Sequence, residues 1–249
     1  MFKVLLILSL VLVCQSQAQI NLSLSNLSTI CLVRPPAALR GRYTSIVCDS
    51  KNINSYTITT LDSNIFRQCA PTLKSLEFHF TGVTSINPAT FKGLYSLSSL
   101  LLNDNQLNSI DAKTFNGLGS LELLDLSANK LKSIDPNTFK SLKRIQRLYL
   151  SNNLLTSIAP STFSDLISLI ELRMSFNQLK SIDPSLFNSM TSLKILDLAG
   201  NQLTSLPTNT FNAVPSLQIL SLNQNQLNSI NPTTFNTTYG LANLNILNL

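Results

Sequence analysis

The sequence has no tryptophan, one histidine and few charged residues, and each shortage removes a class of function. Because His79 is the only histidine, it has no partner for a histidine-based acid–base pair or metal cluster. The seven glycines include no glycine-rich phosphate-binding loop. We therefore expect no catalytic residues, no metal site and no cofactor, and we expect that the protein is not an enzyme.

Positive charge is in modest excess, with a formal net charge of +6 at pH 7. An excess of this size does not require a nucleic-acid partner. The export signal described next also argues against such a partner, so we expect no binding of nucleic acid.

The first residues have the organisation of a secretory signal peptide. Lys3 supplies the positive charge, residues 4–13 are apolar apart from Ser9, and Ser16 and Ala18 place small residues at the spacing that signal peptidase uses. The apolar run is too short to be a membrane anchor, which needs about 20 residues, and no later stretch is apolar enough to span a membrane. We therefore predict a signal peptide at residues 1–18 and a secreted, extracellular protein.

Apolar residues recur at a constant spacing along most of the sequence. The repeated position is occupied by Leu73, Leu97, Leu121, Ile145, Leu169, Leu193 and Leu217. The unit at residues 121–142 reads LELLDLSANKLKSIDPNTFKSL, and the following unit has the same order of apolar positions. A period that stays constant over so many units indicates a solenoid of stacked repeats that bury their apolar faces against one another. We predict seven repeats at residues 73–240.

Each half of the unit has a distinct physical role. Leu124 and Leu126 are two residues apart and therefore point to one face of a short strand, whereas Asp125 points to the other face. The dipeptide Asp135-Pro136 predicts the start of a helical turn, with Asp as the cap and Pro at the first position.

Two further ladders should run along the solenoid. An amide at one shared position can satisfy backbone groups at the turn after each strand. These amides are Asn105, Asn129, Asn153, Asn177, Asn201 and Asn225. A second position predicts a buried aromatic stack, formed by Phe91, Phe115, Phe139, Phe163, Phe187, Phe211 and Phe235. We interpret both ladders as structural.

The unit resembles the 24-residue leucine-rich repeat of extracellular animal proteins, and it is similar to Toll-like receptor ectodomains, Slit-like proteins and small leucine-rich proteoglycans. The resemblance covers about residues 48–249. It implies an α/β-type solenoid, a horseshoe with a concave parallel sheet and a convex side of turns and short helical segments. It also implies binding of proteins, glycans or lipids through the concave face, without specifying the ligand.

The N-terminal segment resembles the disulfide-closed cap of this family. We assign residues 19–47 to the cap region and residues 48–72 to a degenerate first repeat. Cys14 leaves with the signal peptide, so three cysteines remain in the mature chain. We predict that Cys31 pairs with Cys48, which begins the first strand beside the cap, and that Cys69, at a core leucine position, stays reduced.

The C-terminal repeats carry no charge, because no Asp, Glu, Lys or Arg occurs between Leu198 and Leu249. Residues 241–249 begin a further repeat and stop within it. A bare apolar strand is a template for another chain. We therefore expect self-association through this C-terminal edge, a cap supplied by a partner, or an incomplete sequence.

Exposed strand positions in the middle repeats are rich in aromatic and charged residues, the types that anchor protein interfaces. We predict ligand contact on the concave face at Asp125, Arg147, Tyr149, Glu171, Arg173 and Asp197. The alternative is a solvated sheet in which Arg147 pairs with Glu171 and Arg173 pairs with Asp197. A second candidate, for a sulfated glycan, is the basic group of Lys130, Lys132, Lys140, Lys143 and Arg144, although an ordinary solvated convex face is the favoured interpretation.

Three sequons predict glycosylation of an exported chain, at Asn21, Asn26 and Asn236. The last of these follows Phe235 in a connection three residues longer than in other repeats, where a glycan would not disturb stacking.

Two classes of function fit these features. One is a recognition module, either a secreted protein or the ectodomain of a receptor, that binds an extracellular protein or glycan. The other is a structural component of the extracellular matrix.

Overall fold

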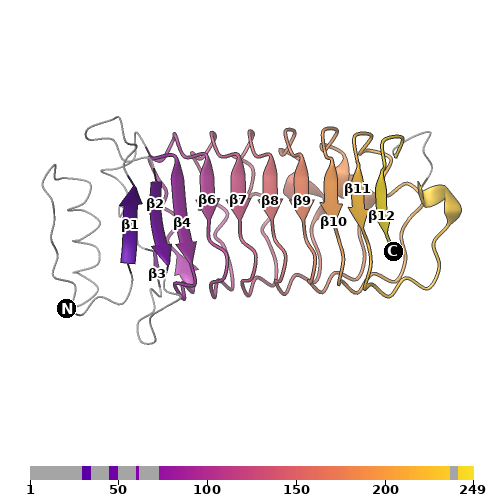
Figure 1. Ribbon diagram of the computed structural model, residues 1–249, viewed down its shortest axis with the longest axis horizontal. Helices are drawn as coiled ribbons and strands as arrows, with labels where there is room; N and C mark the ends of the chain where they lie inside the picture. Colours follow the sequence, from indigo (N-terminus) through magenta and orange to yellow (C-terminus); the bar gives the residue numbers. More distant parts are fainter. Residues whose placement is uncertain (1–29, 35–44, 50–59, 62–72, 236–240) are drawn as a thin grey trace, which may run out of the picture.

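A computed structural model describes residues 30–34, 45–49, 60–61, 73–235 and 241–249, and its described strands form one long sheet. Ten strands lie side by side along the molecule (Figure 1). They are β1 (Ile30–Arg34), β2 (Ser45–Asp49), β4 (Ser75–His79), β6 (Ser99–Leu101), β7 (Leu123–Asp125), β8 (Arg147–Tyr149), β9 (Glu171–Arg173), β10 (Ile195–Asp197), β11 (Ile219–Ser221) and β12 (Ile246–Asn248). A second sheet pairs β3 (Thr60–Leu61) with β5 (Ser85–Ile86). The predicted parallel-sheet solenoid is confirmed.

Neighbouring strands from β2 to β12 are parallel and in register, so each strand residue faces its counterpart in the next repeat. The Cα partner of Leu124 is Leu148, and the partner of Leu148 is Leu172. All three are fully buried, whereas their neighbours on the strands mostly remain accessible. This alternation leaves one open face of the sheet, and the opposite face packs into the core.

The side of the solenoid opposite the sheet is made of turns and single-turn 3-10 helices. The helices are η1 (Pro160–Phe163), η2 (Pro184–Phe187) and η3 (Pro232–Phe235). At η2 the Asp183 carboxylate accepts a hydrogen bond from the Ser185 N–H at 2.9 Å, as the Asp-Pro pattern predicts. Asp135 caps in the same way, with the Asn137 N–H at 2.8 Å, but residues 136–140 form turns and not a helix. In a segment of only one turn, the 3-10 helix and the turn conformation differ little in energy.

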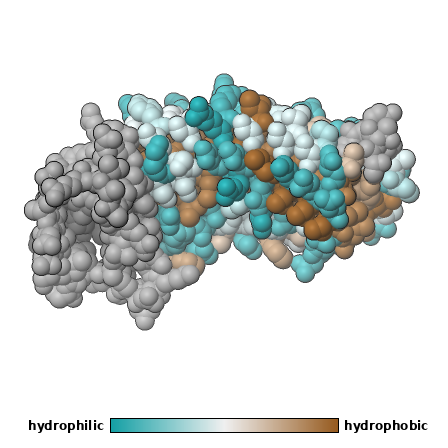
Figure 2. Space-filling model, turned by 45° about the horizontal axis from the view of Figure 1, so that its top comes forward, coloured by the Kyte–Doolittle hydropathy of each residue, from teal (hydrophilic) through white to brown (hydrophobic). Residues whose placement is uncertain are grey.

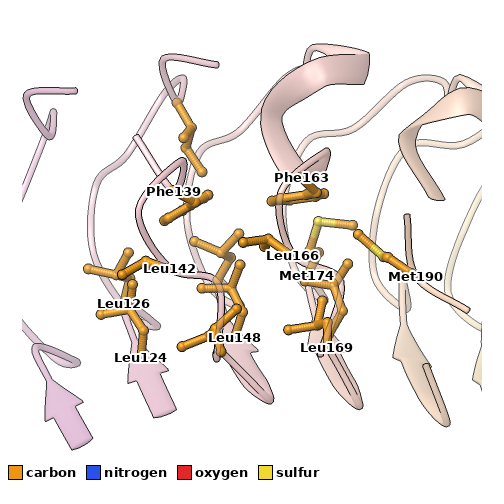
Figure 3. Close-up of a cluster of buried hydrophobic side chains, with 14 of the residues drawn as sticks. Leu124, Leu126, Phe139, Leu142, Leu148, Phe163, Leu166, Leu169, Met174 and Met190 are labelled. Atoms are coloured by element: carbon orange, nitrogen blue, oxygen red, sulfur yellow. The ribbon is translucent and has the colours of Figure 1, made fainter. Parts of the chain in front are cut away.

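The phenylalanine ladder is a strip of the core in which the rings stack from Phe91 to Phe163 and again from Phe187 to Phe235. Phe139 has no exposed surface, and its ring centroid lies 6.2 Å from that of Phe115 and 6.0 Å from that of Phe163. Leucines from the strands pack beneath these rings (Figure 3). The predicted burial is confirmed for the six rings from Phe91 to Phe211, whereas Phe235 in the last of these repeats is only partly buried.

The asparagine ladder is structural, as predicted, because each amide satisfies backbone groups of two repeats. Asn153 Nδ2 donates to the Leu126 carbonyl at 3.0 Å and to the Leu150 carbonyl at 3.1 Å. Its Oδ1 accepts from the Leu131 N–H at 3.0 Å. Equivalent bonds recur in the neighbouring repeats, so the side chains complete the backbone hydrogen bonding between strand and turn.

The first parallel strand, β2, begins at Ser45, within the segment that we assigned to the cap. Its separation from β4 is longer than one regular repeat, since Ser45 is the Cα partner of Ser75. The segment Ser-Ile-Val-Cys-Asp lacks the repeat's leucine pattern, but its β-branched residues suit a strand.

The predicted signal peptide, Cys69 and the three sequons at Asn21, Asn26 and Asn236 lie outside the described residues.

Candidate binding surface on the open face of the sheet

The parallel register brings all six predicted contact residues onto one face of four adjacent strands, β7 to β10. Arg147 is the Cα partner of Glu171. In the next row toward the strand ends, Asp125, Tyr149, Arg173 and Asp197 follow one another across the sheet. Residues two apart on a strand point the same way, so the two rows form a single surface. We call Arg147, Tyr149, Glu171 and Arg173 the central cluster.

Glu171 connects the central cluster through both of its carboxylate oxygens. Arg173 Nε donates to Glu171 Oε1 at 2.5 Å, and the Tyr149 hydroxyl donates to Glu171 Oε2 at 3.1 Å. The Arg173 guanidinium also lies over the Tyr149 ring, 5.6 Å from its centroid, in the geometry of a cation–π contact. A charge-assisted bond, a phenol bond and a ring contact therefore hold three neighbouring side chains in one arrangement.

The two charge pairs of the alternative interpretation, Arg147 with Glu171 and Arg173 with Asp197, do not form in the structure. Glu171 pairs with Arg173 on its own strand, and Arg147 remains exposed. Among the described residues, Arg147 makes no side-chain hydrogen bond or ion pair. Asp197 accepts the backbone N–H of Ala199 at 3.1 Å, which turns this carboxylate toward its own strand end.

The pKa shifts follow from this partly buried geometry. Burial raises the pKa of Tyr149, and the adjacent Glu171 carboxylate raises it further. Burial opposes the charge of Arg173, but its hydrogen bond to Glu171 and the attraction between them outweigh that effect and raise its pKa. Tyr149 therefore stays a hydroxyl donor, and Arg173 stays a cation, throughout the physiological pH range.

The repeats before the central cluster present acidic side chains. Glu77 accepts from the Ser75 hydroxyl at 3.1 Å and lies 3.4 Å from His79 Nε2. Burial raises the pKa of Asp125, although the Ser127 N–H donates to its carboxylate at 2.8 Å and lowers it. The nearby Asp104 carboxylate also raises the pKa of Asp125. This end of the face is therefore rich in carboxyl groups, with His79 beside them.

The repeats after the central cluster present an apolar row. Ile195, Ile219 and Ile246 are successive partners on β10, β11 and β12. Hydrophobic residues are prominent toward the C-terminal end of the molecule in Figure 2. The open face thus changes along its length from acidic, through the mixed central cluster, to apolar.

The sequence groups Phe176 with the exposed aromatic and charged residues of the middle repeats, but not with the six predicted contact residues, and the structure leaves half of its surface exposed. Three of the other six residues at its position, Asp104, Asn152 and Gly200, are types that tolerate the left-handed backbone found there. A bulky phenylalanine is disfavoured in that conformation, and Phe80 is the other phenylalanine that adopts it.

The basic residues near residues 130–144 are a weaker candidate. Lys143 forms an ion pair with Asp165, and Lys130 Nζ donates to the Gln106 side chain at 3.2 Å. All five basic side chains are exposed, where water and salt screen their charges. They are consistent with an ordinary solvated surface.

In residues 73–235 and 241–249, no three His, Cys, Asp or Glu side chains are grouped as metal ligands would be. The part of the chain that the structure describes has no helix of the length and hydropathy of a membrane span.

These observations define a solenoid protein with a preordered polar and aromatic surface on its sheet. The family model described as leucine rich repeat matches at residues 71–131, 95–155, 124–179, 144–203 and 191–249. The chain belongs to the leucine-rich-repeat family, and the predicted resemblance is confirmed. A search of curated proteins finds no significant match.

Solved structures resemble the chain over most of its described length. TLR13 in a complex with ssRNA13 is 27% identical, with a TM-score of 0.72 over 77% of this chain and 26% of that one. Drosophila Toll in its complex with Spatzle is 28% identical, with a TM-score of 0.65 over 70% and 25%. A Leptospira interrogans leucine-rich-repeat protein is 29% identical, with a TM-score of 0.69 over 80% and 47%. The chain therefore spans a quarter to a half of these relatives.

Proposed function

We propose that this chain is a secreted leucine-rich-repeat binding protein that recognises an extracellular protein or glycan through the open face of its sheet. The observation that carries the proposal is the central cluster, in which Tyr149, Glu171 and Arg173 hold one another in place at the middle of the face. Tyrosine and arginine dominate binding energies at interfaces, and side chains that are ordered before binding lose less entropy on binding.

The structural relatives support binding as the role and leave more than one ligand class open. One relative forms a complex with the protein Spatzle and another with a single-stranded RNA. For this chain we favour a ligand other than nucleic acid. Glu77, Asp104 and Asp125 line one end of the face, and carboxylates repel phosphates.

The binding proposal predicts a ranking of variants. A partner is first captured from the surrounding extracellular fluid with the immobilised protein, and its affinity is then measured for each variant. Tyr149→Ala and Arg173→Glu should each weaken binding by more than about 1 kcal/mol, because both remove contacts at the centre of the surface. Lys140→Glu, outside the sheet, is the control and should have no effect. The reverse ranking, with steep salt dependence, would move the site to the basic residues.

We further propose that the chain is exported, glycosylated and closed by a Cys31–Cys48 disulfide. Backbone geometry supports the disulfide, because Cys31 and Cys48 are Cα partners on the antiparallel strands β1 and β2. Opposed residues in such a pair have Cα atoms about 4.5–5.5 Å apart, within the disulfide range of about 4.4–6.8 Å.

Non-reducing peptide mapping of the secreted product tests these features together. We expect a chain that begins at Gln19, a linked Cys31–Cys48 peptide, a reduced Cys69, and glycans at Asn21, Asn26 and Asn236. A Cys48–Cys69 bridge would contradict the disulfide, and a product that retains residues 1–18 would contradict the signal peptide.

A further inference from the structure

Phe176 has a backbone conformation that its residue type disfavours. Its φ is 53°, and the same left-handed conformation recurs once in each repeat. The residues at this position are Phe80, Asp104, Ala128, Asn152, Phe176, Gly200 and Gln224. Glycine, asparagine and aspartate adopt this conformation readily, whereas a bulky side chain is strained in it. The fold alone would therefore favour a residue such as Asn at position 176.

The next repeat makes room for the Phe176 ring. A Cβ atom added to Gly200 would lie 2.5 Å from Phe176 Cδ1 and 2.8 Å from its Cε1, which is closer than atoms can approach. The ring therefore leans over a backbone that lacks a side chain, and 52% of the residue's surface stays exposed. An aromatic ring that is supported below and accessible above can contact a ligand at little entropic cost.

A row of small side chains separates this ring from the central cluster. Ser151 and Ser175 are buried two residues after Tyr149 and Arg173, past the ends of β8 and β9, and the Ser175 hydroxyl donates to Ser151 Oγ at 2.9 Å. These two small, buried side chains bond to each other and form the base of the surface between the ring and the central cluster. The Phe176 ring and the central cluster therefore border the same strip of surface.

The guanidinium groups of the central cluster can accept a carboxylate, although Asp125 and Asp197 flank the cluster in the row of Tyr149 and Arg173. Arg147 is exposed without a side-chain partner among the described residues, and Arg173 uses its Nε for Glu171. The cluster thus holds two guanidinium groups and one carboxylate, which is already occupied by Tyr149 and Arg173.

We propose that Phe176, held over Gly200, is the apolar anchor for a polypeptide ligand. This ligand places an aliphatic or aromatic side chain on the ring and a carboxylate near Arg147 and Arg173. A sulfated glycan would supply the charge without an apolar side chain, and the acidic end of the face at Glu77 and Asp125 opposes a polyanion. The inference rests on the proposed function, since it names the ligand class of the same surface.

Random peptides displayed on phage and selected on the full chain provide the probe. We expect recovered peptides to combine an apolar residue with a nearby Asp or Glu. Their affinity should fall by about tenfold or more in Phe176→Asn, which removes the anchor. Asn152 occupies the equivalent position, so this variant should fold. Phe80→Asn makes the same change four repeats earlier and should leave the affinity unchanged.

Gly200→Ala tests the placement of the ring. Ala128 shows that alanine fits this backbone position, but a methyl group at residue 200 would displace the ring. We expect Gly200→Ala to reduce peptide affinity in the parent protein and to have no further effect in Phe176→Asn.

Several outcomes would overturn the inference. The first is that the peptides bind Phe176→Asn as tightly as they bind the parent protein. The second is that no binding peptide is recovered, whether or not a single-stranded RNA oligonucleotide binds to the protein. The same peptides, measured on Tyr149→Ala and Arg173→Glu, separate the two proposals. Loss of binding in these variants but not in Phe176→Asn removes only the anchor, whereas unchanged binding in all three variants removes the proposed function as well.

Discussion

We expect a protein that lacks residues 145–168 to fold, and a protein that lacks residues 145–156 to lose its cooperative structure. The longer deletion removes one whole repeat, so Leu124 on β7 gains Leu172 on β9 as its neighbour in place of Leu148. The backbone bonds are also restored. Asn177 Nδ2, which donates to the Leu150 carbonyl, meets the equivalent carbonyl of Leu126. A solenoid held together by contacts between neighbouring repeats can lose one repeat and close again.

The shorter deletion breaks the register. It removes β8 and Asn153 but retains Phe163, so one repeat would supply a ring to the aromatic ladder without supplying a strand to the sheet. The Leu131 N–H loses its acceptor, Asn153 Oδ1, and the Leu126 carbonyl keeps the bond from Asn129 but loses the one from Asn153. Each buried backbone group without a partner costs about 1–3 kcal/mol. Circular dichroism with thermal unfolding distinguishes the two products, and an equal loss of structure in both would refute the register of the repeats.

Phe139→Ala should lower the free energy of unfolding by about 3–5 kcal/mol, the usual cost of truncating a buried aromatic residue. The ring is completely buried between those of Phe115 and Phe163, so the substitution removes contacts with two repeats and leaves a cavity. Neighbouring rings cannot close that cavity, because each belongs to its own repeat.

Urea denaturation measures this loss, with Tyr95→Ala as the matched control. Tyr95 is an aromatic residue two repeats earlier, but 66% of its surface is exposed, so its removal should change the free energy of unfolding little. If the two substitutions cost the same, the phenylalanine ladder would not be the structural strip that the packing indicates.

The repeating part of the molecule could be predicted from the sequence, because every unit has the same type of residue at each equivalent position. Leu124 had to be buried and Asp125 exposed once a strand was inferred, since side chains alternate along a strand. The amide of Asn153 and the ring of Phe139 followed from the same period. The shared face of the six candidate residues was predictable for this reason too.

The departures from the period were decided only by the tertiary structure. Glu171 could pair with a cation on its own strand or on the preceding one, and the choice of Arg173 over Arg147 depends on the neighbouring Tyr149, whose hydroxyl and ring both take part. The start of β2 at Ser45 depends on its pairing with Ser75 of β4, outside the regular spacing of the repeats. The position of Phe176 depends on a glycine one repeat later. Strand positions repeat along the sequence and can be read from it. The contacts between non-repeating side chains depend on which residues the folded solenoid brings together.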